Sequence, residues 1–87
     1  MATLDHLSEL VRAAKPIPLT GQVRLDSSRT LELIGAARLE FPHAEEAFDL
    51  LEDLVNAGLP IPLCDEVRVD RRRLERALGA ARSASEL

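Results

Sequence analysis

Aromatic residues are scarce in this 87-residue sequence, which contains two phenylalanines and no tryptophan or tyrosine, so its core must be mainly aliphatic. A single cysteine, Cys64, cannot form an internal disulfide bond. No apolar run approaches the roughly 18 residues of a transmembrane helix. The N-terminal residues also lack the basic and apolar regions of a signal peptide. We therefore expect a soluble, cytoplasmic protein.

Residues that could perform catalysis or bind a metal are few and scattered. A zinc site built from His6, His43 and Cys64 would lack a fourth ligand and the usual ligand spacing. The acidic residues that follow Cys64 disfavour a reactive thiolate. Ser27 and Ser28 lack the glycine elbow and the His/Asp partners of a nucleophilic serine. We therefore expect no enzyme activity, no metal and no cofactor.

Charge is abundant but unevenly distributed along a chain whose net charge is −4. Residues 40–66 carry eight acidic residues and no lysine or arginine, whereas residues 67–82 carry six arginines. Such segregation favours electrostatic docking, within the chain or between copies of it. The net negative charge makes nucleic acid an unlikely partner. With 46% hydrophobic and 30% charged residues, the chain has the composition of a globular protein.

The strongest pattern is an internal repeat with an offset of 44 residues. When residues 7–38 are aligned with residues 51–82 without gaps, 16 of the 32 pairs are identical. The identities include the strings Pro-Ile-Pro-Leu, at 16–19 and 60–63, and Gly-Ala-Ala-Arg, at 35–38 and 79–82. We interpret the chain as a tandem duplication, with repeats at 4–41 and 44–84 forming one domain over residues 1–87.

Each repeat has the pattern of a helix, an extended hairpin and a second helix. Apolar residues at three- and four-residue spacing predict the first helix, and the prolines of Pro-Ile-Pro-Leu, including Pro18 and Pro62, exclude helix and require extended backbone. A short alternating segment then predicts a strand. Asp26 and Asp70 stand at the N-cap of the second helices, predicted at about 27–40 and 71–84.

The predicted fold is mainly α with short β-strands (α+β), in which four helices surround the strands about a pseudo-twofold axis. We expect the strands at Val23–Leu25 and Val67–Val69 to pair antiparallel. Gly35 and Gly79 lie within helices at a cost of about 1 kcal/mol each relative to alanine, which suggests close approach of another helix. The residues expected to fill the centre are Ile17, Leu19, Ile61 and Leu63.

An arginine cluster is the candidate binding site, consisting of Arg68, Arg71, Arg72, Arg73 and Arg76. Arginines in the first turn of a helix oppose the helix macrodipole, so local stability does not explain them. Three kinds of partner would explain these arginines: the acid-rich helix at 44–57, an acidic protein, or phosphate or nucleic acid. We favour the acid-rich helix, since no aromatic residues accompany the arginines to stack on bases.

The string Leu7-x-x-Leu10-Val11-x-x-Ala14-x-Pro16-x-Pro18-Leu19-Thr20-x-x-Val23-x-Leu25-Asp26, followed by a leucine-bearing helix and Pro42, resembles a known module. It is similar to the N-terminal module of DivIVA-like actinobacterial coiled-coil division and septum proteins. The resemblance covers one repeat at a time, and this chain has no long coiled coil. It implies a bacterial scaffold in division or growth that acts through self-association and protein contacts.

Two functions are consistent with the sequence. The first is a non-enzymatic protein–protein interaction, scaffolding or adaptor module that forms oligomers. The alternative is a small DNA-binding regulator or antitoxin, because a strand that leads into an arginine-rich helix resembles the arrangement of ribbon-helix-helix proteins. Only Arg24 and Arg68 are expected to point outward from such a ribbon.

Overall fold

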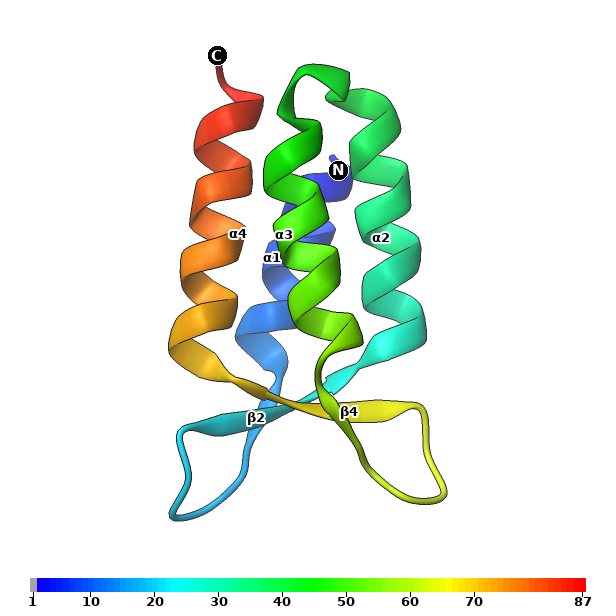
Figure 1. Ribbon diagram of the computed structural model, residues 1–87, viewed down its shortest axis with the longest axis vertical. Helices are drawn as coiled ribbons and strands as arrows, with labels where there is room; N and C mark the ends of the chain where they lie inside the picture. The colour runs from blue at the N-terminus through cyan, green and yellow to red at the C-terminus, as the bar shows by residue number, and fades with distance from the viewer. Residues whose placement is uncertain (1) are drawn as a thin grey trace.

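The computed structural model describes residues 2–87 as four helices and a four-stranded sheet (Figure 1). The elements in chain order are α1 (Thr3–Ala13), β1 (Lys15–Pro16), β2 (Gln22–Asp26), α2 (Ser27–Glu40), the short 3-10 helix η1 (Pro42–Ala44), α3 (Glu45–Asn56), β3 (Leu59–Pro60), β4 (Glu66–Asp70) and α4 (Arg71–Ser85). The predicted α+β class is confirmed.

Strands β2 and β4 form the centre of the sheet, whose order is β1-β2-β4-β3 with every pair antiparallel. The predicted antiparallel pairing of Val23–Leu25 with Val67–Val69 is therefore confirmed. Arg24 lies directly opposite Arg68, its counterpart 44 residues later. The register of the central pair is thus symmetric about these two arginines.

Helices α2 and α4 begin directly after the central strands, and both are capped by aspartate. Asp26 Oδ1 accepts a hydrogen bond from the backbone N–H of Arg29 at 2.9 Å, and Asp70 Oδ1 accepts one from the N–H of Arg73 at 3.0 Å. A side-chain oxygen at this position satisfies one of the unpaired N–H groups at the start of a helix, which contributes about 1 kcal/mol. The sequence-based prediction of both caps is confirmed.

The helices form a four-helix bundle, and the sheet lies across one end of it (Figure 1). Helices α1 and α3 run toward the sheet and α2 and α4 run away from it, so neighbours in the chain are antiparallel. The β1–β2 and β3–β4 hairpins extend beyond the bundle on the side of the sheet away from the helices (Figure 1). Among residues 2–87, no helix is both long and apolar enough to cross a lipid bilayer.

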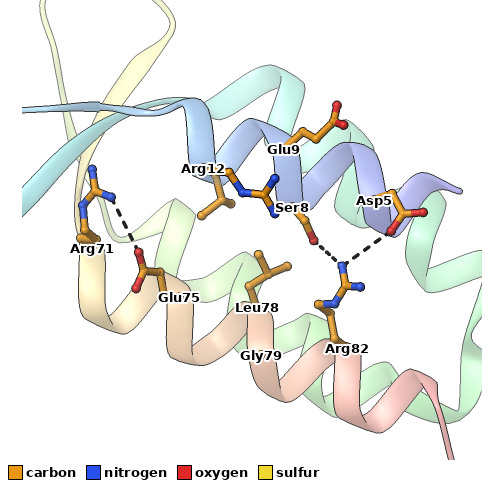
Figure 2. A pocket seen from close by; sticks show the side chains of 10 residues that line it. Asp5, Ser8, Glu9, Arg12, Arg71, Glu75, Leu78, Gly79 and Arg82 are labelled. Atoms are coloured by element: carbon orange, nitrogen blue, oxygen red, sulfur yellow. Dashed lines mark hydrogen bonds and ion pairs between the residues drawn. The ribbon is translucent and has the colours of Figure 1, made fainter. Parts of the chain in front are cut away.

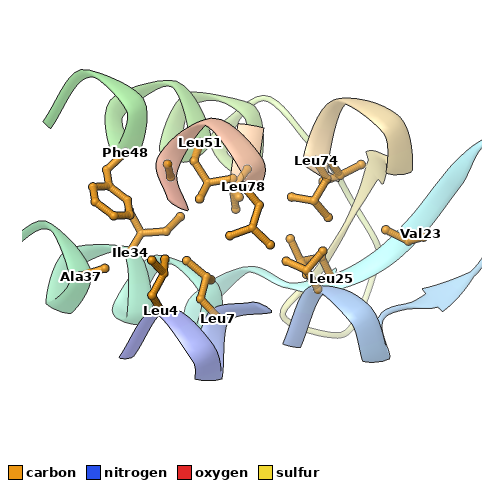
Figure 3. Close-up of a cluster of buried hydrophobic side chains, with 14 of the residues drawn as sticks. Leu4, Leu7, Val23, Leu25, Ile34, Ala37, Phe48, Leu51, Leu74 and Leu78 are labelled. Atoms are coloured by element: carbon orange, nitrogen blue, oxygen red, sulfur yellow. The ribbon is translucent and has the colours of Figure 1, made fainter. Parts of the chain in front are cut away.

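The core lies between the four helices and the adjacent face of the sheet (Figure 3). Apart from Ala44, its buried residues occupy equivalent positions of the two repeats. These pairs are Leu4/Phe48, Leu7/Leu51, Val11/Val55, Val23/Val67, Leu25/Val69, Thr30/Leu74, Ile34/Leu78 and Ala37/Ala81. The two halves thus share element order, strand register and buried positions, and they contribute to one core. Their origin by duplication stays a prediction.

The prediction that Ile17, Leu19, Ile61 and Leu63 fill the centre is wrong. Leu19 and Leu63 are fully exposed, and the two isoleucines are half-buried outside the core. Since Ile17 N–H bonds to the carbonyl of Gln22, the strand alternation places Ile17 on the sheet face opposite to Val23. Each Pro-Ile-Pro-Leu string therefore forms an edge strand and a turn, and Val23, Leu25, Val67 and Val69 supply the buried strand side chains.

The prediction that Gly35 and Gly79 allow close approach of another helix is also wrong. A methyl group added at either glycine would meet no atom within 4 Å outside its own helix. The small residue that does permit close packing is Gly58, after α3, where an added Cβ would lie 3.0 Å from the Val67 side chain and 3.1 Å from the Val55 carbonyl oxygen.

Replacing Gly79 by alanine is therefore expected to stabilise the protein by about 1 kcal/mol, the difference in helix propensity. For a domain of this size, such a gain raises Tm by roughly 4–8 °C. The matched change Gly58→Ala is expected to lower Tm, because the Val55 backbone cannot move away from the new methyl group. Thermal unfolding followed by circular dichroism checks both changes, and a lower Tm for Gly79→Ala would show that another element packs on this glycine.

Candidate protein-interaction surfaces

The tips of the two hairpins have the same unusual backbone. In the first tip, Thr20 N–H donates to the Ile17 carbonyl at 3.3 Å, which closes a four-residue turn with Pro18 at its second position. Leu19 at the third position has φ of 64°, and Leu63 in the second hairpin has φ of 68°. Proline followed by a positive φ is typical of a type II turn, which normally has glycine at the third position. Pro18 and Pro62 therefore lie in turns, where the sequence predicted extended backbone, and Pro16 and Pro60 are the prolines of the edge strands.

These two leucines carry a conformational cost that the fold does not require. A non-glycine residue in the left-handed region costs on the order of 1–3 kcal/mol. Within residues 2–87, Leu19 and Leu63 are the non-glycine residues with positive φ, and both side chains are fully exposed. Neither residue thus gains burial free energy in the isolated chain. Each hairpin instead holds an apolar side chain outward at its tip.

The outer face of the sheet is polar at its centre. Lys15, Arg24, Arg68 and Leu59 are consecutive partners across the four strands. Arg24 Nη2 donates to Glu66 Oε1 at 2.6 Å, and this hydrogen bond with its ion pair raises the pKa of the Arg24 guanidinium. The first repeat has Gln22 where the second has Glu66, so Arg68 has no equivalent acidic neighbour. The Nε atom of Arg68 is buried and unpartnered.

The arginine cluster of the sequence is divided between surfaces. Arg68 lies on the sheet, and Arg71 forms an ion pair at 3.7 Å with Glu75 of its own helix. Arg73 and Arg76 line a shallow groove of about 290 Å³ between α3 and α4. For the part of the chain that is described, no ion pair joins any of the five clustered arginines to α3. The favoured interpretation, docking on the acid-rich helix, is therefore not supported by an ion pair, although Arg73 and Arg76 lie beside α3.

A different arginine pairs with two of the acidic residues of α3. Arg38 of α2 pairs with Asp49 of α3 at 2.8 Å and with Glu52 at 3.2 Å. Its counterpart Arg82 reaches from α4 to α1 (Figure 2), where the nearest atoms are Ser8 Oγ at 2.6 Å and an Asp5 carboxylate oxygen at 3.8 Å. Sequence reasoning missed both roles, although the shared Gly-Ala-Ala-Arg string marked these positions as equivalent.

The contact between α1 and α4 is looser than the equivalent contact between α3 and α2. A groove of about 570 Å³ runs between α1 and α4, and charged side chains from both helices line it (Figure 2). Val11 and Leu78 beside it are 7% and 8% exposed, whereas their counterparts Val55 and Ile34 are 1% and 0% exposed. The bundle therefore has an open seam between its first and last helices, α1 and α4.

Cys64 and His43 lie in separate parts of the fold, Cys64 between β3 and β4 and His43 in η1. Cys64 is exposed and its Sγ lies 3.5 Å from the Ile61 carbonyl oxygen, so it occupies the turn position of Thr20. His43 stacks edge-on against Phe41 and its Nε2 lies 3.3 Å from the Ser85 carbonyl oxygen. Among residues 2–87, no three His, Cys, Asp or Glu side chains are grouped closely enough to hold a metal ion.

Comparison with known proteins does not identify a relative for this arrangement. The resemblance of each repeat to the DivIVA-like module consequently stays a prediction. The candidate interaction surfaces are the two hairpin tips, the outer face of the sheet and the α3/α4 groove. No protein-family model, curated protein or solved structure matches the chain.

Proposed function

We propose that this protein is a non-enzymatic protein–protein interaction and scaffolding module that binds a partner protein through its two hairpin tips. The observation that supports the proposal is the pair of exposed leucines, Leu19 and Leu63, each held at a tip in a left-handed backbone conformation. A backbone conformation that opposes folding and occurs at both hairpin tips is explained if the two leucines serve binding.

The two leucine side chains supply part of the free energy of binding when both tips engage the partner together. Full burial of a leucine side chain contributes about 1.5–3 kcal/mol. Both turns have proline at the second position, and in the first the Thr20 hydroxyl also donates to the Ile17 carbonyl at 2.8 Å. The side chains are thus held in place before binding, which reduces the entropy lost on association.

The partner class that fits is a protein with two apolar pockets separated by a polar surface. The pockets would receive the leucines, and the surface between them would face the Lys15, Arg24 and Arg68 row on the sheet. Because each repeat resembles a module of division and septum proteins, bacterial division scaffolds are the first candidates to test.

The test is the double change Leu19→Asn and Leu63→Asn. Asparagine tolerates the left-handed region better than leucine does, so we expect Tm to be unchanged or higher while partner capture is lost. Partners are captured by cross-linking from an extract of the source cells and competed with the free protein. Leu39→Gln, which changes an exposed leucine of α2, is the matched control and should retain capture.

Partner capture that survives the double change would contradict this function. A loss of Tm in the double variant would show that the leucines contribute to folding. Either result would remove the physical basis of the proposal.

A DNA-binding regulator is the second candidate, favoured by one observation. The antiparallel β2/β4 pair presents Arg24 and Arg68 side by side on its outer face, and each strand leads into a capped helix. Base-reading ribbons have this arrangement, although Glu66 already pairs with Arg24. A gel-shift titration with random duplex at about 50 mM salt, where phosphate contacts are strongest, decides the question. Absence of a shift would exclude this candidate.

A further inference from the structure

We propose that the α3/α4 face is a dimerisation surface that binds a second copy of this chain. The α3/α4 face consists of Ala47, Leu50 and Asp53 on α3, and Arg73, Arg76, Ala77 and Ala80 on α4. This inference goes beyond the proposed interaction function, because it names a second copy of the chain as the partner and a surface other than the hairpins.

The face is an apolar strip bordered by charge. Ala47 and Leu50 of α3, with Ala77 and Ala80 of α4, form the apolar part of the groove between the two helices, and Arg73 and Arg76 border it. The four α4 positions are spaced by three and four residues, so they lie on one side of the helix. Leu50 is 65% exposed although it lies beside this groove. A surface of this kind is suited to a helical partner.

The charges on the face are not neutralised within the chain. Glu46 and Asp53 lie one turn before and after Leu50, and both are exposed. Over residues 2–87, neither these acids nor Arg73 and Arg76 form an ion pair, whereas Asp49 and Glu52 on the α2 side of α3 are paired with Arg38. The face thus presents acidic groups on one helix and basic groups on the adjacent helix.

This distribution is self-complementary when two copies face each other across a twofold axis parallel to the bundle. That axis places α4 of each copy opposite α3 of the other, and the facing helices are antiparallel. Asp53 lies about 5 Å from the last residue of α3, and Arg73 and Arg76 lie about 3 and 8 Å from the first residue of α4, at 1.5 Å per residue. All three are near the sheet end, so both arginines face the other copy's Asp53.

The alternative axis, perpendicular to the helices, would place acidic α3 against acidic α3. Like charges opposite one another cost several kcal/mol at an interface. The charge pattern therefore selects a single isologous arrangement, in which each residue pair occurs twice.

The equivalent face of the first repeat lacks this segregation. Glu32 on α2 stands at the position of Arg76, and His6 on α1 stands at the position of Leu50. Arg29 is the counterpart of Arg73, and both are the third residue of a helix capped by aspartate. Arg29→Glu is consequently a matched control for a charge reversal at Arg73.

The experiment is sedimentation equilibrium of the full chain and three variants at about 100 mM salt, with circular dichroism as the check on folding. The wild-type chain is expected to be dimeric, and the dimer to weaken as salt is raised. We expect R73E/R76E to raise the dimer dissociation constant roughly 100-fold or more, since like charges then face each other twice. R29E is expected to remain dimeric.

The charge-swap mixture tests the geometry itself. D53R alone is expected to be monomeric, because it faces Arg73 and Arg76 of its copy. An equimolar mixture of D53R with R73E/R76E is expected to form heterodimers, because opposite charges then face each other at both contacts. A mixture that stays monomeric while both variants are folded would overturn the proposed pairing.

Other outcomes separate this inference from the proposed function. A wild-type chain that is monomeric at about 0.5 mM would overturn the proposal that a second copy binds the α3/α4 face. An acidic helix of another protein would then be the alternative partner, because Arg73 and Arg76 are positively charged. Loss of the dimer in Leu19→Asn/Leu63→Asn would also overturn it, since self-association would then use the hairpins. Retained partner capture by that variant contradicts the proposed function and leaves the dimer untouched.

Discussion

Replacing Phe48 by alanine is expected to lower the free energy of unfolding by about 3–5 kcal/mol, the usual range for a buried phenylalanine. Phe48 is 0% exposed and its ring lies next to Ile34 in the core (Figure 3). Small domains have total stabilities of roughly 5–15 kcal/mol, so the variant should be partly unfolded near physiological temperature. Urea denaturation followed by circular dichroism measures the change.

The matched control is Leu4→Ala, which alters the equivalent position of the first repeat. Leu4 is 8% exposed and belongs to α1, which borders the open seam with α4. Water can reach the space that its side chain leaves, so we expect a loss of about 2 kcal/mol, the lower end of the range for leucine. An equal or larger loss at Leu4 would show that the seam is closed in solution.

The features that could be predicted from the sequence are those set by local chemistry. The Asp26 and Asp70 caps, the helices that follow them and the strand alternation depend on residues within a few positions of each other. The antiparallel pairing of β2 with β4 was predictable for a second reason: two equivalent hairpins, each too small to be stable alone, can complete one sheet only by pairing with each other.

The leucines of the hairpin tips could not be placed from the sequence, because a hydrophobic residue is assigned to the core by default. Leu19 follows Pro18 in a turn whose third position has positive φ, a position at which glycine is expected and leucine is not. The mistaken role of Gly79 has a similar origin. Whether a helical glycine is packed or open depends on the separation of α1 from α4, and this separation is a tertiary property.

The partners of the arginines also depend on tertiary structure. Arg38 and Arg73 both belong to helices that pack against α3. The rotation of each helix about its own axis determines which arginine faces the carboxylates of α3. Arg38 lies on the α2 side, where Asp49 and Glu52 point, and Arg73 lies beside the apolar groove on the other side. Charge composition alone could not separate these two roles.

A fragment comprising residues 1–42 is expected not to fold as a monomer. It retains the β1–β2 hairpin but loses β4, which pairs with the whole length of β2. Val23 and Leu25, each 1% exposed in the full chain, would become accessible to water. A two-stranded hairpin is marginal in water, and a chain of about 40 residues buries too little apolar surface to compensate. Circular dichroism and proton NMR at micromolar concentration should show an unstructured chain.

At higher concentration the same fragment is expected to form a folded homodimer. The register of β2 against β4 is symmetric about Arg24 and Arg68, so two copies of β2 can pair in that register with Arg24 opposite Arg24. Adding the fragment 43–87 should convert this homodimer into a heterodimer, because Glu66 then neutralises Arg24 as it does in the full chain. Size-exclusion chromatography with light scattering follows both steps. A folded, monomeric 1–42 fragment would show that each repeat has a core of its own, in contradiction to the shared core described above.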